Sequence, residues 1–150
     1  MGVYPGDMLP PKAPSVKPGF YIANTDPHYK AGEHWVAFYI PSNLTKNPME
    51  YWDSYGLYPP EIFTPFLEAS YLRNTKFIQH PLSSTCGQYC IYYILKRYRG
   101  HSLEKIVGEF SVDTLQNDII VNKTVEDNFN VDLNIFELEY LYQQICRSFK

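Results

Sequence analysis

Short apolar runs separated by turn-forming residues dominate the first half of the chain. Three runs, rich in β-branched and aromatic residues, predict buried strands at 20–24 (FYIAN), 34–40 (HWVAFYI) and 49–53 (MEYWD). Because turn residues separate these runs, an antiparallel meander is expected. A fourth strand is predicted at 76–79, ended by Pro81.

The second half of the chain follows a helical period. A helix is predicted at 86–99, where apolar positions recur on one face and Gly100 supplies a stop signal. Amphipathic patterns predict further helices at 102–110 and 135–149, and 111–132 is ambiguous between helix and loop.

The remaining segments are rich in proline. The first 19 residues hold five prolines and three glycines, which predicts an extended, irregular arm. Pro59 is well placed to open a helix, and apolar residues follow it at nearly helical spacing at 62, 63, 66, 67 and 72.

This order of elements predicts an α+β fold. An antiparallel or mixed sheet would pack against one central helix, which carries a cysteine, with further helices at the C-terminus. A length of 150 residues with 45% hydrophobic content is typical of a single domain spanning 1–150. No window holds the roughly 20 apolar residues that a membrane span requires, so a soluble chain without a leader is expected.

Net charge and cysteine content argue against several classes of protein. The net charge of −3 gives no positive field for holding nucleic acid, so DNA binding is not supported by composition. Three cysteines are an odd number, and Cys86 and Cys90 share one predicted helix, which favours a reducing, intracellular compartment over a disulfide framework. No His or Cys set has complete zinc-ligand spacing, so neither metal nor cofactor is expected.

Cys86 lies in the first turn of the predicted 86–99 helix. Unpaired N–H groups and the helix dipole stabilise an anion there, and the thiolate is the nucleophilic form of cysteine. Gly87 would let a substrate backbone approach closely. Taken alone, Cys86 is better explained as a small buried residue than as a nucleophile, and Cys90, one turn later, is expected to point inward and be structural.

A cysteine nucleophile needs a base held in the correct tautomer by an acceptor. His34 begins one predicted strand and Asp53 ends the next, so antiparallel pairing would bring both to one sheet edge. Each residue also has an ordinary explanation, as a hydrogen-bonded histidine and as a turn-capping aspartate.

Gln79 precedes Cys86 by seven residues, at the end of a predicted strand. Its amide could donate to a developing oxyanion together with the backbone N–H of Cys86. The alternative is a polar residue that closes a strand.

Several motifs between residues 2 and 97 combine with these signals. They are GVYPGDMLP at 2–10, IANT at 22–25, GEHWVAF at 32–38, YWDSYG at 51–56, Gln79, and STCGQYC at 84–90. With these motifs the sequence resembles the adenovirus maturation protease, and more closely the cysteine proteases of virus-like DNA transposons of the Polinton or Maverick kind.

This resemblance implies a cysteine endopeptidase that cleaves viral or virus-like precursor proteins at small, glycine-containing sites. His34, Asp53 and Cys86 would be the catalytic triad, with Gln79 in the oxyanion hole. A narrow substrate slot beside Trp35 and Gly87 is also implied, as is a location in the host nucleus or cytoplasm or in the virion.

Two features depart from the adenoviral pattern. The adenoviral enzyme has a glutamate at the position of Asp53, whereas SUMO-specific proteases of the same clan use aspartate. The adenoviral enzyme is also activated by DNA and by a peptide that forms a disulfide with a cysteine lying between the acid and the nucleophile in the sequence. No cysteine lies between Asp53 and Cys86, so an activating peptide would not be disulfide-linked as in adenovirus.

Three rival functions follow from the same motifs. A deubiquitinase or SUMO-type isopeptidase would react with activated ubiquitin-family probes. An inactive interaction domain would show ordinary thiol reactivity at Cys86. An acetyltransferase would transfer acetyl groups from coenzyme A without cleaving peptides.

Overall fold

The computed structural model describes residues 2–10 and 16–129, and these residues contain a five-stranded sheet with strands in the order β1-β2-β3-β4-β5. The strands are β1 Gly2–Tyr4, β2 Gly19–Asn24, β3 Trp35–Ile40, β4 Met49–Trp52 and β5 Tyr71–Arg73. The predicted meander is confirmed, because β2, β3 and β4 pair antiparallel with their neighbours. Both edge strands pair parallel, so the sheet is mixed.

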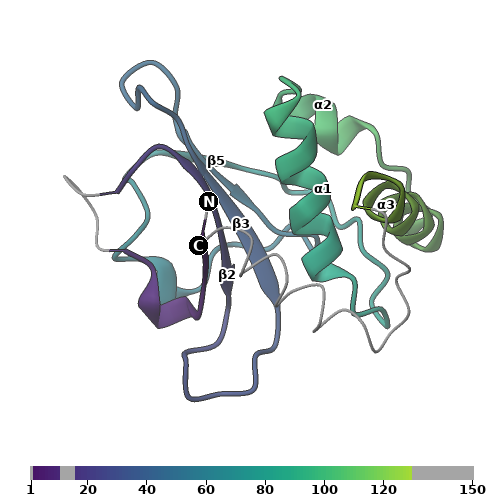
Figure 1. Ribbon diagram of the computed structural model, residues 1–150, viewed down its shortest axis with the longest axis horizontal. Helices are drawn as coiled ribbons and strands as arrows, with labels where there is room; N and C mark the ends of the chain where they lie inside the picture. Colours follow the sequence, from purple (N-terminus) through teal and green to yellow (C-terminus); the bar gives the residue numbers. More distant parts are fainter. Residues whose placement is uncertain (1, 11–15, 130–150) are drawn as a thin grey trace.

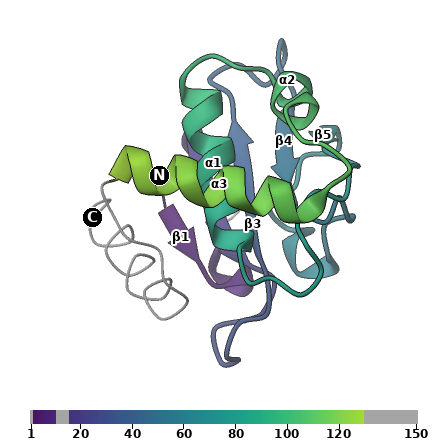
Figure 2. The same cartoon turned by 90° about the vertical axis from the view of Figure 1, so that its right-hand side faces the viewer.

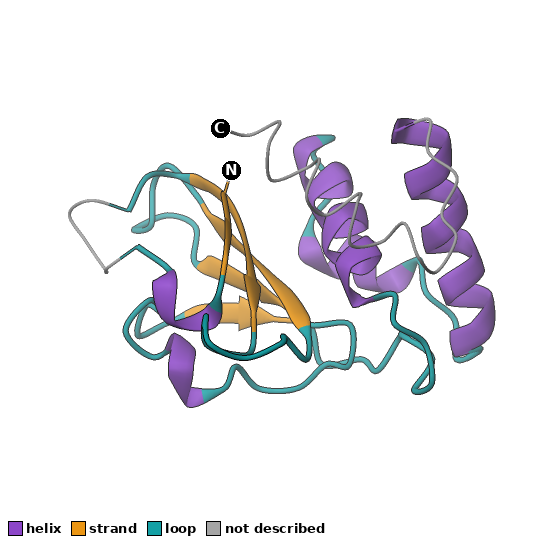
Figure 3. Cartoon of the chain, turned by 60° about the horizontal axis from the view of Figure 1, so that its bottom comes forward, coloured by secondary structure: helices purple, strands orange, loops and turns teal. Residues whose placement is uncertain are grey.

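Helices and short turns cover opposite faces of this sheet (Figures 1 and 3). One face packs against α1 Cys86–Tyr98, followed by α2 Leu103–Gly108 and α3 Thr114–Phe129. Figure 2 shows α3 crossing in front of α1. The other face packs against the short 3-10 helix η2 Glu61–Phe63, near η1 Gly6–Met8. The α+β prediction is therefore confirmed.

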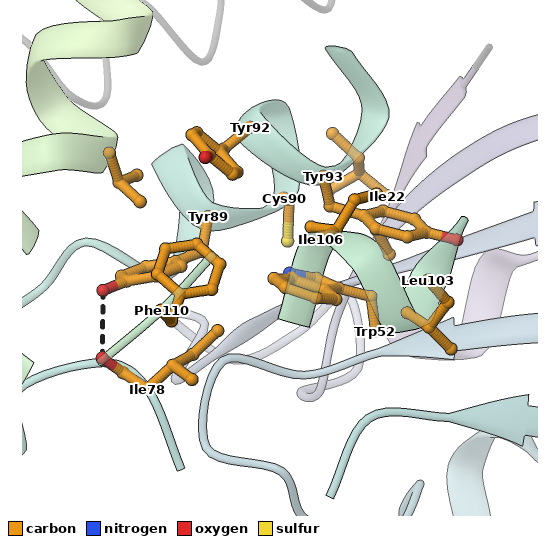
Figure 4. Close-up of a cluster of buried hydrophobic side chains, with 12 residues drawn as sticks. Ile22, Trp52, Ile78, Tyr89, Cys90, Tyr92, Tyr93, Leu103, Ile106 and Phe110 are labelled. Atoms are coloured by element: carbon orange, nitrogen blue, oxygen red, sulfur yellow. Dashed lines mark hydrogen bonds between the residues drawn. The ribbon is translucent and has the colours of Figure 1, made fainter. Parts of the chain in front are cut away.

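Alternation along the strands produces these two apolar layers. On β2 and β3, Ile22 and Ala37 face the helices, whereas Ala23 and Phe38 face the opposite layer. In Figure 4, Cys90 lies among the aromatic side chains that line the helix side, close to Trp52. Cys90 is 1% exposed, which confirms that its side chain points inward as expected.

The predicted helix after Pro59 is wrong. That segment forms only η2, and Leu72 lies in β5. Pro65 explains the interruption, because its nitrogen has no hydrogen to donate to the carbonyl four residues earlier. Burial of Phe63 and Phe66 against the sheet nevertheless produces the apolar spacing that resembles a helix.

The predicted strand at 76–79 is also wrong. The N–H groups of Ile78 and Gln79 both donate to the Ser54 carbonyl, at 2.9 and 3.1 Å, instead of forming a strand ladder. Side chains from α1 and α3 bind the Ile78 carbonyl. The segment is thus an irregular connection whose backbone polar groups are satisfied without sheet pairing.

The helices after residue 85 agree better with the predictions made from the sequence. The predictions at 86–99 and 102–110 are confirmed by α1 and α2, and most of the ambiguous segment forms α3. The helix expected at 135–149 lies outside the described residues. The N-terminal arm is not wholly irregular, because it supplies the edge strand β1 and the short helix η1.

A buried ion pair ties α1 to β4. The guanidinium of Arg97 donates to both carboxylate oxygens of Glu50, at 2.9 and 3.0 Å, and Glu50 also accepts from the Tyr93 hydroxyl. Bidentate pairs of this kind fix orientation as well as distance. The contact anchors the C-terminal half of α1 on the sheet and so helps to place its first residue, Cys86. Across the described part of the chain, no helix is both long and apolar enough to span a bilayer.

Candidate active site

Strand pairing brings His34 and Asp53 together at one edge of the sheet. His34 immediately precedes β3 and Asp53 immediately follows β4, and these strands are antiparallel neighbours. His34 Nε2 lies 2.8 Å from Asp53 Oδ1. The two side chains are 15% and 3% exposed, so little solvent screens the contact.

Cys86 is the first residue of α1 and is buried. Its side chain is close enough to the ring of His34 to contribute to raising the pKa of the imidazole. Because Nε2 faces Asp53, Nδ1 is the ring nitrogen left for the sulfur. The hydroxyl of the N-cap residue Thr85 pairs with Ser83 Oγ at 2.8 Å and makes no capping bond. The first-turn N–H groups therefore keep their partial positive charge beside the sulfur.

The surroundings of His34 favour its protonated form. Burial alone lowers the pKa of His34, but hydrogen bonds and negative charge from Asp53 and Cys86 outweigh it and raise the pKa from 6.5 to about 9. The imidazolium is therefore favoured at neutral pH. A neighbouring cation and a helix N-terminus are the surroundings in which catalytic cysteines are found.

This raised pKa predicts a loss of stability in alkaline solution. A group whose pKa is higher in the folded state contributes stability that is complete below its unfolded pKa and disappears as pH rises through the folded value. For His34, the window runs from 6.5 to about 9, and about 3 kcal/mol of unfolding free energy is at stake.

Denaturant unfolding at pH 6.5 and 9.5 would measure this loss in the wild-type chain and in His34→Ala. We expect the free energy of unfolding to fall more steeply with pH in the wild type. Parallel pH profiles for the two proteins would refute the assigned environment of His34.

Asp53 is held rigidly by its neighbours. Its Oδ1 also accepts from the Tyr55 N–H at 2.8 Å, and its own N–H donates to Asn74 Oδ1 at 2.9 Å. The Asn74 amide returns a hydrogen bond to the Asp53 carbonyl. Asn74 is 3% exposed. Sequence analysis missed Asn74, because an asparagine in a loop 21 positions from its partner carries no local signal.

An aromatic stack covers the imidazole. The rings of His34 and Tyr55 are stacked with centroids 5.0 Å apart, and Phe77 stacks on Tyr55 at 5.2 Å. Burial and the nearby charge of Cys86 raise the pKa of Tyr55. Tyr55 therefore remains a neutral phenol over the working range of the site.

Gln79 is fully buried and its amide orientation is fixed. The Ser54 hydroxyl donates to Oε1 at 2.6 Å, and Nε2 lies 2.9 Å from the Ser83 carbonyl and 3.2 Å from the Ser83 hydroxyl. Ser83 belongs to the short loop that leads into Cys86. The amide thus points toward the approach to α1, and its role in an oxyanion hole stays a prediction.

The two predicted substrate-binding residues lie in different surroundings. Gly87 is buried in the first turn of α1. Trp35 is half-buried and borders an open pocket of about 280 Å³, formed between the N-terminal arm and the turn before β3. Val3, Asn24 and Gly32 line the same pocket. A slot that joins Trp35 to Gly87 remains a prediction.

Within residues 2–10 and 16–129, no cluster of three His, Cys, Asp or Glu side chains could hold a metal ion. A thiol, an imidazole and a carboxylate in sequence form the arrangement that nucleophilic catalysis requires.

Comparisons with known proteins give little further information. The sequence matches no protein-family model, and no curated protein matches it significantly. A similar solved structure is the pS273R protease of ASFV, with 19% identity and a TM-score of 0.48 over 68% of this chain. The match spans 43% of that protease. At this level of similarity, the activity of the neighbour does not transfer to the present chain.

Proposed function

We propose that the protein is a cysteine endopeptidase. The observation that carries the proposal is the 2.8 Å contact of His34 with the buried Asp53 carboxylate. Cys86, at the N-terminus of α1, is near enough to help raise the pKa of the same imidazole to about 9. A structural histidine has no need of a thiol at a helix N-terminus on one side and a buried carboxylate on the other. A nucleophile, a base and an orienting acid need this connectivity.

The reaction proceeds by acyl transfer. The Cys86 thiolate attacks the scissile carbonyl carbon, a C–S bond forms, and the carbonyl electron pair moves to the oxygen. The C–N bond then breaks as the His34 imidazolium gives its proton to the leaving amine, which leaves a thioester. Neutral His34 next removes a proton from water, the hydroxide attacks the thioester, and the C–S bond breaks to restore the thiolate.

The oxyanion of each tetrahedral intermediate requires donors. We assign the backbone N–H of Cys86 and one amide hydrogen of Gln79, whose 3.2 Å contact with the Ser83 hydroxyl is the longer of its two contacts with Ser83. A single donor of this kind contributes about 2.7–4 kcal/mol to transition-state stabilisation. Asp53 keeps the imidazole oriented and balances its charge through both steps.

The substrates proposed are viral or virus-like precursor proteins, cleaved inside a host cell or a virion at small, glycine-containing sites. Support comes from the motif resemblance and from Gly87, which leaves room for a substrate backbone at the nucleophile. Trp35, next to the base in the sequence, is the second residue of the proposed substrate slot.

A mixture-based peptide library, analysed by mass spectrometry, tests both activity and site preference. We expect Cys86-dependent cleavage that is enriched at glycine-containing bonds. In parallel, ubiquitin and SUMO carrying a C-terminal electrophile should label Cys86 poorly. Efficient labelling without peptide cleavage would instead identify an isopeptidase, and no reaction in either assay would exclude a hydrolase.

A further inference from the structure

The irregular segment 78–80, which bears Gln79, is held by side chains from two helices. Before Gln79, the Ile78 carbonyl accepts from the Tyr89 hydroxyl at 3.1 Å, a bond drawn in Figure 4, and from Asn117 Nδ2 at 3.0 Å. After Gln79, the His80 N–H donates to Asp118 Oδ1 at 3.2 Å. Gln79 is therefore clamped on both flanks.

Asp118 connects this segment to the nucleophile helix. The same oxygen, Oδ1, accepts from the His80 N–H and lies 2.8 Å from the Tyr89 hydroxyl, whose single proton it shares with the more distant Ile78 carbonyl. Asp118 is 5% exposed and Tyr89 is fully buried. Tyr89 lies in the first turn of α1, three positions after Cys86. One carboxylate oxygen thus joins the helix that carries the thiol to the segment that carries the amide.

The segment depends on such contacts because it has no strand ladder. Its backbone N–H groups before His80 share the single Ser54 carbonyl. A donor to an oxyanion is effective only when it is already in place, and a displacement of about 1 Å can cost 10²-fold in rate. Contacts at residues 78 and 80 control where the amide between them lies.

Resting on the proposed function, we infer that Asp118 is a positioning residue that acts through Gln79. With Asn117 and Tyr89, it fixes the distance between the Gln79 amide and the Cys86 sulfur. The role assigned to α3 is therefore to set the oxyanion geometry, in a part of the chain where no family motif was recognised.

Comparing two reactions of Cys86 distinguishes a positioning role of Asp118 from a general effect on the fold. Acylation by p-nitrophenyl acetate passes through an oxyanion and releases p-nitrophenolate in a burst. Alkylation by iodoacetamide forms a C–S bond as iodide leaves and needs no oxyanion donor. We expect Asp118→Ala to slow the burst by about 10- to 100-fold while the alkylation rate stays within about twofold of the wild type.

A double-mutant cycle tests whether Asp118 acts through Gln79. If Asp118 acts through Gln79, Asp118→Ala combined with Gln79→Ala should be no slower than Gln79→Ala alone, within about twofold. Asp118→Asn keeps an acceptor oxygen and should restore most of the burst rate. Asp127→Ala, an exposed carboxylate on the same helix that pairs with Lys123, is the matched control and should change neither reaction.

The inference would be overturned if the double variant were slower in the burst than Gln79→Ala by the full factor that Asp118→Ala shows alone. It would also be overturned if Asp118→Ala lowered the acylation and alkylation rates equally. Should Asp118→Ala fail to fold, Tyr89→Phe takes its place in the same cycle, because it removes only the hydroxyl bound to Asp118 and Ile78. Absence of a Cys86-dependent burst in the wild type is a separate outcome, which would remove the proposed function and this positioning role together.

Discussion

Cys86→Ala should lose peptide cleavage by about 10⁴-fold or more, because no other group at the site can form the thioester. The substitution removes one sulfur atom next to His34 and leaves α1 intact. We therefore expect a folded protein, judged by circular dichroism and by its denaturant midpoint. Initial rates on a peptide identified in the library would measure the loss.

Cys90→Ala is the matched control for this variant. Cys90 lies one helical turn from Cys86 and is fully surrounded by the core. Burial, with the charges of Cys86 and Asp53, raises the pKa of the Cys90 thiol well above its usual value, so it stays protonated and unreactive. We expect a stability loss of about 1 kcal/mol with cleavage retained. Equal activity in Cys86→Ala and the wild type would exclude the assigned nucleophile.

His34→Ala should reduce cleavage by about 10³- to 10⁴-fold near neutral pH. The variant lacks both the cation that stabilises the thiolate and the acid that protonates the leaving amine. It also leaves the buried Asp53 carboxylate without its partner. Hydroxide can deprotonate the thiol and can replace His34 as the base that activates water in thioester hydrolysis. Part of the lost rate should therefore return as pH rises, and the rate of the wild type should not rise in this way.

His101→Ala serves as the control for the loss of an imidazole. His101 is half-buried near Glu109, beyond the C-terminal end of α1, whereas Cys86 begins that helix. Its removal should leave the pH profile of cleavage unchanged. A His34→Ala variant that cleaves as fast as His101→Ala would show that His34 is not the base.

Much of the sheet and its helix was predictable because local patterns matched the final contacts. The runs ending at Asn24, Ile40 and Trp52 combine strand propensity with burial on both faces, so their pattern agreed with their tertiary role. Residues at the ends of adjacent antiparallel strands meet by geometry. The pairing of His34 with Asp53 could therefore be anticipated from two strand predictions.

The connections between these elements could not be predicted in the same way. Phe63 and Phe66 are spaced as if on a helix, but they are buried by a proline-interrupted turn. The segment at Gln79 resembles a strand by composition, whereas its conformation depends on groups about 25 to 39 positions away, including Ser54 and Asn117. Sequence periodicity carries no information about such distant side-chain partners.

The central claim is that His34 activates the sulfur of Cys86, and the alkylation rate of Cys86 tests it most directly. Iodoacetamide modification at pH 6.5 would be followed by peptide mass mapping in the wild type, His34→Ala and His101→Ala. The account predicts rapid modification in the wild type and in His101→Ala, and modification in His34→Ala at least about tenfold slower, as for an ordinary thiol. Equal rates in all three proteins would contradict it.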